Sequence, residues 1–184
     1  MSKVVVIGCS SGGLAPLVDL LSELPATYPH PIIVASHSGP ESHLLPALKL
    51  KSKIQIAIKK AEDGEELVGQ TVYVLPGATH GLVTGNTLRL SELVRESGFR
   101  PSIDALFMTA AAEYQENTIG VVLSGTMSDG MRGAQVIYDM GGVTIVQDPD
   151  EAKQASMPQS VIKADHPQEV LEASALGQWL VKAQ

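Results

Sequence analysis

Short runs of β-branched and apolar residues alternate with amphipathic helical patterns along almost the whole chain. Several of these runs are continuously apolar, which is typical of strands buried on both faces of a parallel sheet. We expect strands at Lys3–Ile7, Pro31–Ser36, Ile54–Ile58, Thr71–Leu75, Thr118–Ser124 and Val143–Gln147. We expect helices at Gly13–Leu24, Ser102–Tyr114, Asp129–Met140 and Gln168–Lys182. The alternation predicts an α/β fold with a doubly wound, mostly parallel sheet and flanking helices.

One stretch departs from this alternation. Ile54, Ile56 and Ile58 alternate with polar or small residues, and further on His80–Val83 and Thr87–Leu90 flank a turn that contains Gly85. This pattern predicts an antiparallel hairpin at one edge of the parallel sheet. Since no linker, low-complexity tract or internal repeat follows, we expect one domain over residues 1–184.

The composition excludes several classes of function. With 13 basic and 20 acidic side chains, the chain carries a formal net charge of −7, so we expect no nucleic-acid partner. The single cysteine, Cys9, rules out an internal disulfide framework and a multi-cysteine zinc site, and we expect no metal. No apolar stretch approaches the roughly 20 residues that a membrane span needs. We therefore expect a cytoplasmic protein without membrane insertion.

The first expected strand runs into a glycine-rich turn that fits the G-x-S-x-G pattern at Gly8, Ser10 and Gly12. Glycines on both sides let the chain turn sharply, so that a serine hydroxyl stands clear of the sheet and can act as a nucleophile. Two alternatives remain: the turn could cradle a phosphate through Ser10 and Ser11, or Ser10 could simply cap the next helix. The G-x-G-x-x-G and G-x-x-x-x-G-K-[ST] patterns of nucleotide binding are absent, so we expect no cofactor. Cys9 fits a small buried residue better than a nucleophile.

A nucleophilic serine needs a general base at the same edge of the sheet. His37 directly follows the apolar run at 32–35, just as Ser10 follows the first strand. The carboxyl ends of parallel strands share one edge, so His37 is the leading candidate. His80, which trails another strand by a Pro-Gly loop, is its rival.

The same edge argument selects a carboxylate to orient the base. Asp129 lies between a strand and a helix, although it could also cap that helix. Asp148 is its rival after the strand at 143–147. Asp104 fits better in the first turn of the helix that starts near Ser102.

The residues around Ser10 also resemble a known family. Ile7-Gly8-Cys9-Ser10-Ser11-Gly12-Gly13 is similar to the I-G-A-S-[TA]-G-G start of the catalytic domain of bacterial chemotaxis protein-glutamate methylesterases, the CheB family. Further matches follow in order at Ala35-Ser36-His37, Ala61-Glu62-Asp63-Gly64-Glu65, Val74-Leu75-Pro76-Gly77, Arg100-Pro101-Ser102-Ile103-Asp104-Ala105-Leu106-Phe107, Leu123-Ser124-Gly125 with Asp129-Gly130, and Met157-Pro158.

The resemblance implies a serine esterase that hydrolyses glutamyl methyl esters on methyl-accepting chemotaxis receptors, often with deamidation of receptor glutamines. It implies Ser10 as nucleophile, His37 as general base and Asp129 as the orienting carboxylate. Backbone amides of Ser11 and Thr126 would stabilise the oxyanion. The family commonly carries an N-terminal receiver domain, whereas the matches here start at the first strand, which predicts a free-standing esterase or a fragment.

The chain departs from the family pattern in a loop and at a flanking residue. Thr126, Met127 and Ser128 replace the usual Met-Gly-x before Asp129, and the lost glycine restricts the backbone. Phe99 stands where the family commonly has histidine. The altered loop raises the alternative of a catalytically weakened receptor-binding or regulatory module.

The charge of the chain bears on its expected substrate. Receptor methylation regions tend to be acidic, so a protein of net charge −7 gains no long-range attraction. We expect a locally positive or neutral cleft rim, with Arg100 and Arg132 as candidates and Arg100 as a substrate-binding residue. The sequence leaves the oligomeric state open.

Overall fold

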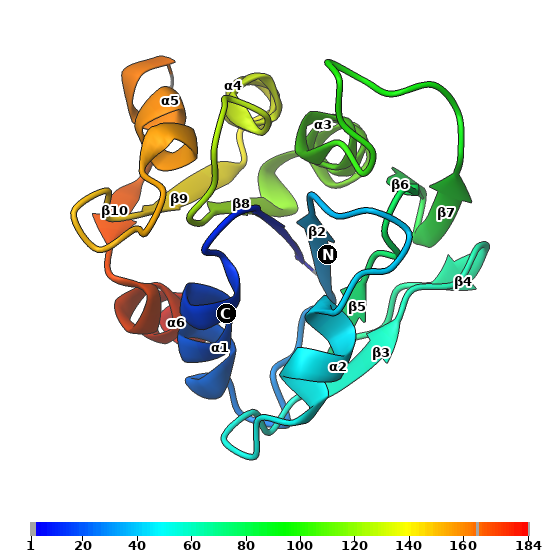
Figure 1. Ribbon diagram of the computed structural model, residues 1–184, viewed down its shortest axis with the longest axis horizontal. Coiled ribbons are helices and arrows are strands. Elements are labelled where there is room, and N and C mark those ends of the chain that lie inside the picture. Colours follow the sequence, from blue (N-terminus) through cyan, green and yellow to red (C-terminus); the bar gives the residue numbers. More distant parts are fainter. Residues whose placement is uncertain (1–2, 165, 184) are drawn as a thin grey trace.

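The computed structural model describes residues 3–164 and 166–183, so Met1, Ser2, Asp165 and Gln184 of the expected domain lie outside the described residues. Within the described part, seven parallel strands form one sheet in the order β10-β9-β8-β1-β2-β5-β3 (Figure 1). These strands are β1 (Val4–Cys9), β2 (Ile32–Ser36), β3 (Ala57–Lys60), β5 (Thr71–Val74), β8 (Thr118–Val122), β9 (Val143–Gln147) and β10 (Glu169–Leu171). The expected parallel sheet is confirmed.

Helices cover both faces of this sheet, as a doubly wound fold requires (Figure 1). One face packs against α3 (Ile103–Tyr114), α4 (Met131–Asp139) and α5 (Ser156–Ala164), and the other against α1 (Leu14–Ser22), α2 (Leu44–Lys49) and α6 (Ala173–Lys182). The central strands are apolar at nearly every position because side chains on both faces are buried.

The order of the strands determines where a site can form. From β1 the chain adds β2, β5 and β3 on one side, then returns through α3 to place β8, β9 and β10 on the other. The direction in which successive strands are added to the sheet therefore reverses between β1 and β8. Ligands of open α/β sheets bind at the carboxyl end of such a reversal, where the loops after the two strands diverge. Here these are the β1–α1 and β8–α4 loops.

A second, smaller sheet contains the predicted hairpin. β6 (His80–Thr84) pairs with β7 (Thr87–Ser91), and β7 pairs with the two-residue strand β4 (Glu65–Glu66), all antiparallel. The hairpin is confirmed, but it forms a separate sheet rather than hydrogen-bonding to the edge of the parallel one. That edge is β3, which pairs with β5 in parallel.

Other differences concern short elements. The expected helix Gln168–Lys182 is interrupted, because its first residues form strand β10 beside β9 and the helix begins only at Ala173. The helices α2 and α5 have no expected counterpart; each contains a proline within a short run, at Pro46 and Pro158, which obscures a helical pattern. A 3₁₀ turn at Gln115–Asn117 links α3 to β8. In the part of the chain described, no helix has the length and apolarity to cross a membrane.

Candidate active site

Ser10 occupies a tight turn between β1 and α1. Its amide donates to the Ser124 carbonyl at 2.9 Å, and its own carbonyl accepts from the Gly13 amide at 2.9 Å. The turn needs glycine at position 12, where φ is +78°. The N-cap of α1 is Gly13, without a side-chain cap, so the alternative in which Ser10 caps the helix is wrong. The Ser10 hydroxyl forms no hydrogen bond within the described residues and lies half-buried.

Ser124, which follows β8, holds this turn against the rest of the sheet edge. Its buried hydroxyl donates to the Ser11 carbonyl at 2.9 Å and accepts from the Gln154 amide at 3.0 Å. Its amide donates to Gln147 Oε1 at 2.8 Å. The nucleophile turn is therefore connected to β8 and to the loop after β9 by hydrogen bonds that no sequence pattern indicated.

His37 leaves the sheet beside Ser10. The parallel register pairs Cys9 with Ser36, so Ser10 and His37 come next on neighbouring strands. Neighbouring strands lie about 4.8 Å apart. The His37 amide donates to the Cys9 carbonyl at 3.2 Å, which keeps the two chains together one residue beyond the ladder. The imidazole is 11% exposed.

Asp129 is the carboxylate that His37 contacts. His37 Nε2 lies 2.7 Å from Asp129 Oδ2, and the carboxylate is fully buried. Its oxygens also accept from the Ile103 amide at 2.7 Å and the Asp104 amide at 2.9 Å, at the start of α3. Burial would raise the pKa of Asp129, but the hydrogen bonds from His37 and these two amides outweigh it and hold the pKa below its usual value. Asp129 is therefore ionised, and His37 Nε2 carries the proton that it donates.

The alternative role for Asp129, as a cap of α4, is wrong. The N-cap of α4 is Gly130, and it has no side-chain cap. Asp104 supplies the missing acceptor: its Oδ1 accepts from the Gly130 amide at 2.9 Å and from the Gly133 amide at 2.7 Å. Burial raises the pKa of Asp104 to about 6, with the negative charge of Asp129 adding to the effect and the two amides opposing it.

A third acid completes this cluster. Glu96, Asp104 and Asp129 each bring one carboxylate oxygen within 4.8 Å of the others. Glu96 accepts from the Ser102 hydroxyl at 3.0 Å and pairs with Arg132 at 3.0 Å. Amides, a hydroxyl, an imidazole and a guanidinium thus share the negative charge, which makes the cluster a hydrogen-bonded support for Asp129.

The rival residues have other surroundings. The buried His80 accepts from the Ser102 amide at Nδ1 (3.2 Å) and donates from Nε2 to the Val94 carbonyl (3.1 Å), so both ring nitrogens are occupied by backbone. Asp148 accepts from the Asp150 amide in a local turn at 2.9 Å. Cys9 is buried, and burial raises its pKa to about 11 despite a hydrogen bond with Ser36, so its thiol stays protonated.

Comparisons with known proteins show the family and the fold of the chain. The family model described as CheB methylesterase matches residues 5–180. The chain belongs to the CheB methylesterase family. It is 35% identical to a protein-glutamate methylesterase/protein-glutamine glutaminase of Thermotoga maritima, with 98% of this chain and 54% of that protein covered. A Leptospira interrogans relative whose name gives the same two activities is 36% identical, with 98% of this chain and 94% of that protein covered. The crystal structure of the T. maritima CheB methylesterase catalytic domain superposes with a TM-score of 0.92 at 32% identity, and the match covers 100% of both chains.

One departure from the CheB family pattern lies against the candidate base. The Phe99 ring stacks on the His37 imidazole, with 4.0 Å between ring centroids and 8° between ring planes. Phe99 sits on a tight turn closed by two backbone hydrogen bonds with Glu96, of 2.8 and 3.1 Å. An aromatic ring in this position covers one face of the imidazole.

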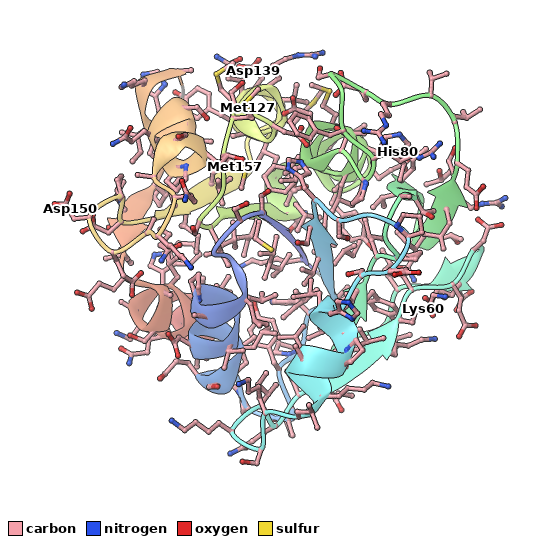
Figure 2. All side chains as sticks on the ribbon, viewed as in Figure 1. Lys60, His80, Met127, Asp139, Asp150 and Met157 are labelled. Carbon is pink, nitrogen blue, oxygen red and sulfur yellow. The ribbon has the colours of Figure 1, made fainter. Side chains whose placement is uncertain are left out.

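The other departure is the loop before Asp129. Met127, where the resemblance implies a glycine, adopts φ +71° and is 63% exposed on the β8–α4 loop (Figure 2). The chain therefore keeps a left-handed backbone there without the glycine that favours it. Neither the Thr126 amide nor the Ser11 amide donates a hydrogen bond within the described residues, so both remain available to an incoming group.

The two candidate rim arginines contact neighbouring loop and helix residues, although the buried Nε of Arg100 has no partner among the described residues. Arg100 Nη1 donates to the backbone carbonyls of Glu92 and, at 3.0 Å, Leu93, within the loop that precedes α3. Arg132 pairs with Glu96. A cleft of about 690 Å³ instead opens from Ser10 between α1 and α2, and neither arginine lines it.

Proposed function

We propose that this chain hydrolyses glutamyl methyl esters on a methyl-accepting chemotaxis receptor, with Ser10 as nucleophile, His37 as general base and Asp129 as the carboxylate that orients the base. The 2.7 Å contact between His37 and Asp129, one strand away from Ser10, is the observation that carries the proposal. We also propose that residues 1–184 act as one catalytic domain.

The position of the proton on the His37 imidazole gives each ring nitrogen a different role. Nε2 donates to the ionised Asp129, which leaves Nδ1 as the basic nitrogen. As the Ser10 hydroxyl attacks the ester carbonyl, Nδ1 takes its proton, and the resulting imidazolium is stabilised by the Asp129 carboxylate. The buried carboxylate cannot rotate away, because two α3 amides hold it.

The charge that develops on the substrate oxygen needs hydrogen-bond donors. The Ser11 amide directly follows the nucleophile, and the Thr126 amide lies in the loop on the β8 side; neither donates to an acceptor among the described residues. We assign these amides to the oxyanion. Collapse of the tetrahedral intermediate passes the proton from His37 to the leaving methanol, and water then releases the glutamate carboxylate by the same steps.

An amide follows the same path, with ammonia as the leaving group. The relatives are named for both reactions, so we extend the proposal to receptor glutamines. The alternative of a weakened binding module is not favoured, since the relatives are named as enzymes and the Thr126–Ser128 loop keeps a left-handed residue at position 127.

The test is release of methanol from methylated receptor by the wild type, Ser10→Ala and His37→Ala proteins. We expect loss of about a thousandfold or more in kcat for each variant. His80→Gln serves as the matched histidine control and should retain most of the activity once its folding is verified. Equal methanol release by Ser10→Ala would contradict the proposal.

A further inference from the structure

We propose that the cleft between α1 and α2 binds an acidic segment of the protein substrate next to the modified glutamate, with Lys51 and Lys153 contacting its carboxylates. The inference rests on the proposed function, because it assigns Ser10 as the reacting group at one end of the cleft.

The shape of the cleft suits a peptide segment. Its volume is about 690 Å³, within the usual range for ligand sites. Ser10 and Gly12 line the end nearest β1, and Ser36 and Ser38, on either side of His37, line it too, whereas His37 and Asp129 do not. The cleft therefore begins at the nucleophile and at the end of β2, and the rest of a substrate chain can lie between α1 and α2 once its ester reaches Ser10.

The two helices contribute apolar side chains to the cleft, while Ser36, Ser38, Ser42 and His43 line it from β2 and the loop before α2. Leu14, Ala15 and Val18 project from α1, and Leu44 and Ala47 from α2. Leu14 is 38% exposed, on the face of α1 that lines the cleft rather than on the face that packs into the core. An occupant with apolar side chains would remove this surface from water.

The charge of the cleft contrasts with that of the whole protein. Although the chain carries −7, the lining includes Lys51 and Lys153 against one carboxylate, Asp19. Both lysines are exposed, and neither forms an ion pair with a described residue. The two rim arginines, in contrast, already contact neighbouring loop and helix residues. The free cations therefore lie where a substrate segment would enter.

The two lysines come from different parts of the chain. Lys153 is beside the nucleophile turn, since a β-carbon at position 12 would lie 2.8 Å from Lys153 Cβ. Lys51 lies just beyond the C-terminal end of α2, whose last residue is Lys49. A segment with acidic groups on either side of an apolar surface matches this arrangement.

Other occupants fit less well. A second copy of this chain would bring a further charge of −7 to the cleft and would be repelled at long range. A small inorganic anion would leave the apolar walls in contact with water. An acidic segment of the substrate uses both the cations and the walls.

The experiment compares three peptides that contain one glutamyl methyl ester and differ only in their flanking residues, which are glutamate, glutamine or lysine. Methanol release is measured for the wild type, for Lys51→Glu/Lys153→Glu, and for Lys53→Glu/Lys60→Glu. The control pair changes the net charge equally at exposed lysines outside the cleft lining, one of them on β3 (Figure 2). Hydrolysis of p-nitrophenyl acetate by each protein corrects for changes in the reactivity of Ser10.

Relative to p-nitrophenyl acetate, we expect the wild type to favour the glutamate-flanked peptide about tenfold in kcat/KM over the glutamine-flanked one. The Lys51→Glu/Lys153→Glu protein should reverse the order and favour the lysine-flanked peptide, while the control pair stays within about twofold of wild type. Wild-type rates that do not depend on the flanks, or equal losses in the two double variants, would overturn the cleft assignment and leave the esterase proposal standing.

Binding separates failure of the cleft from failure of the proposed function. In the Ser10→Ala background, fluorescence anisotropy of the labelled glutamate-flanked peptide should show at least fivefold weaker binding after Lys51→Glu/Lys153→Glu. If binding weakens in this way but the wild type releases no methanol, the esterase proposal is contradicted and the cleft assignment stands. Equal binding by both proteins would contradict the cleft assignment.

Discussion

Asp104 and Asp129 each accept the amide hydrogen bonds of the other's helix. Asp129, one residue before the N-cap of α4, accepts from the Ile103 and Asp104 amides of α3. Asp104, in the first turn of α3, accepts from the Gly130 and Gly133 amides of α4. Helix N-termini leave amides unpaired, so each carboxyl group supplies hydrogen-bond acceptors to the neighbouring helix. The partner of His37 is thereby fixed by two helices at once.

The raised pKa of Asp104 predicts how Asp104→Asn changes stability with pH. The folded pKa of about 6 lies above the ordinary 3.8, so Asp104 favours folding in its protonated form. That contribution is complete below pH 4 and is lost as the pH rises through 6. One pKa unit corresponds to about 1.4 kcal/mol, so the loss amounts to about 3 kcal/mol. Asparagine keeps an oxygen for both amides and cannot ionise.

We therefore expect the free energy of unfolding of Asp104→Asn, relative to wild type, to rise by about 2 to 3 kcal/mol between pH 4 and pH 8. Urea denaturation at several pH values measures it. Asp150→Asn, at an exposed aspartate, should show no such trend. A difference from wild type that is the same at every pH would contradict the prediction.

Asp129→Asn should lower activity by changing the tautomer of His37. The amide oxygen of asparagine can still accept from the Asp104 amide, but its NH₂ group would replace Oδ2, lose the bond from the Ile103 amide and donate to His37 Nε2. The imidazole would then carry its proton on Nδ1, the nitrogen that must accept from Ser10. We expect kcat for methanol release to fall by about a thousandfold or more, with KM nearly unchanged. A loss confined to KM would show that Asp129 serves substrate binding instead.

Sequence patterns predicted which residues lie at the carboxyl ends of the strands. They did not predict the residues that hold these in place. Ser10, His37 and Asp129 are candidates because each follows an apolar strand, and parallel strands bring those ends together. Asp104, Ser124 and Phe99 act through contacts between segments 25 or more residues apart. An aspartate in the first turn of a helix can accept hydrogen bonds from the amides of its own helix or of another helix. The local sequence is the same in both cases.

The same contrast between local patterns and tertiary contacts explains which helices and strands could be predicted. Long buried strands and the helices α1, α3 and α4 have strong local patterns and were predicted. Strand β10, with three residues, depends on pairing with β9, and the two-residue strand β4 exists only through its pairing with β7 in the smaller sheet. Such short elements exist only through tertiary contacts, which local propensity does not report.

Phe99→Leu should slow the reaction without weakening substrate binding. The stacked ring holds the imidazole plane at 8° to its own, and aromatic pairs of this kind contribute about 1 kcal/mol beyond burial. Leucine fills similar space without a flat face, so the imidazole of His37 would be held in its present plane in a smaller fraction of molecules. We expect kcat to fall about five- to tenfold, with KM within twofold, and Phe99→Tyr to restore kcat. Equal rates for the leucine and tyrosine variants would exclude a positioning role for the ring.

Met127→Gly should stabilise the protein. Met127 holds φ at +71°, a conformation that costs a side-chain-bearing residue about 1 kcal/mol and costs glycine almost nothing. Its side chain is 63% exposed, so little packing is lost. Met140 is a matched control, since it is 45% exposed but has φ −87° at the end of α4. Urea denaturation should show a gain of about 0.5 to 1 kcal/mol for Met127→Gly and a loss of similar size for Met140→Gly. Losses in both variants would mean that the left-handed backbone at position 127 is not strained.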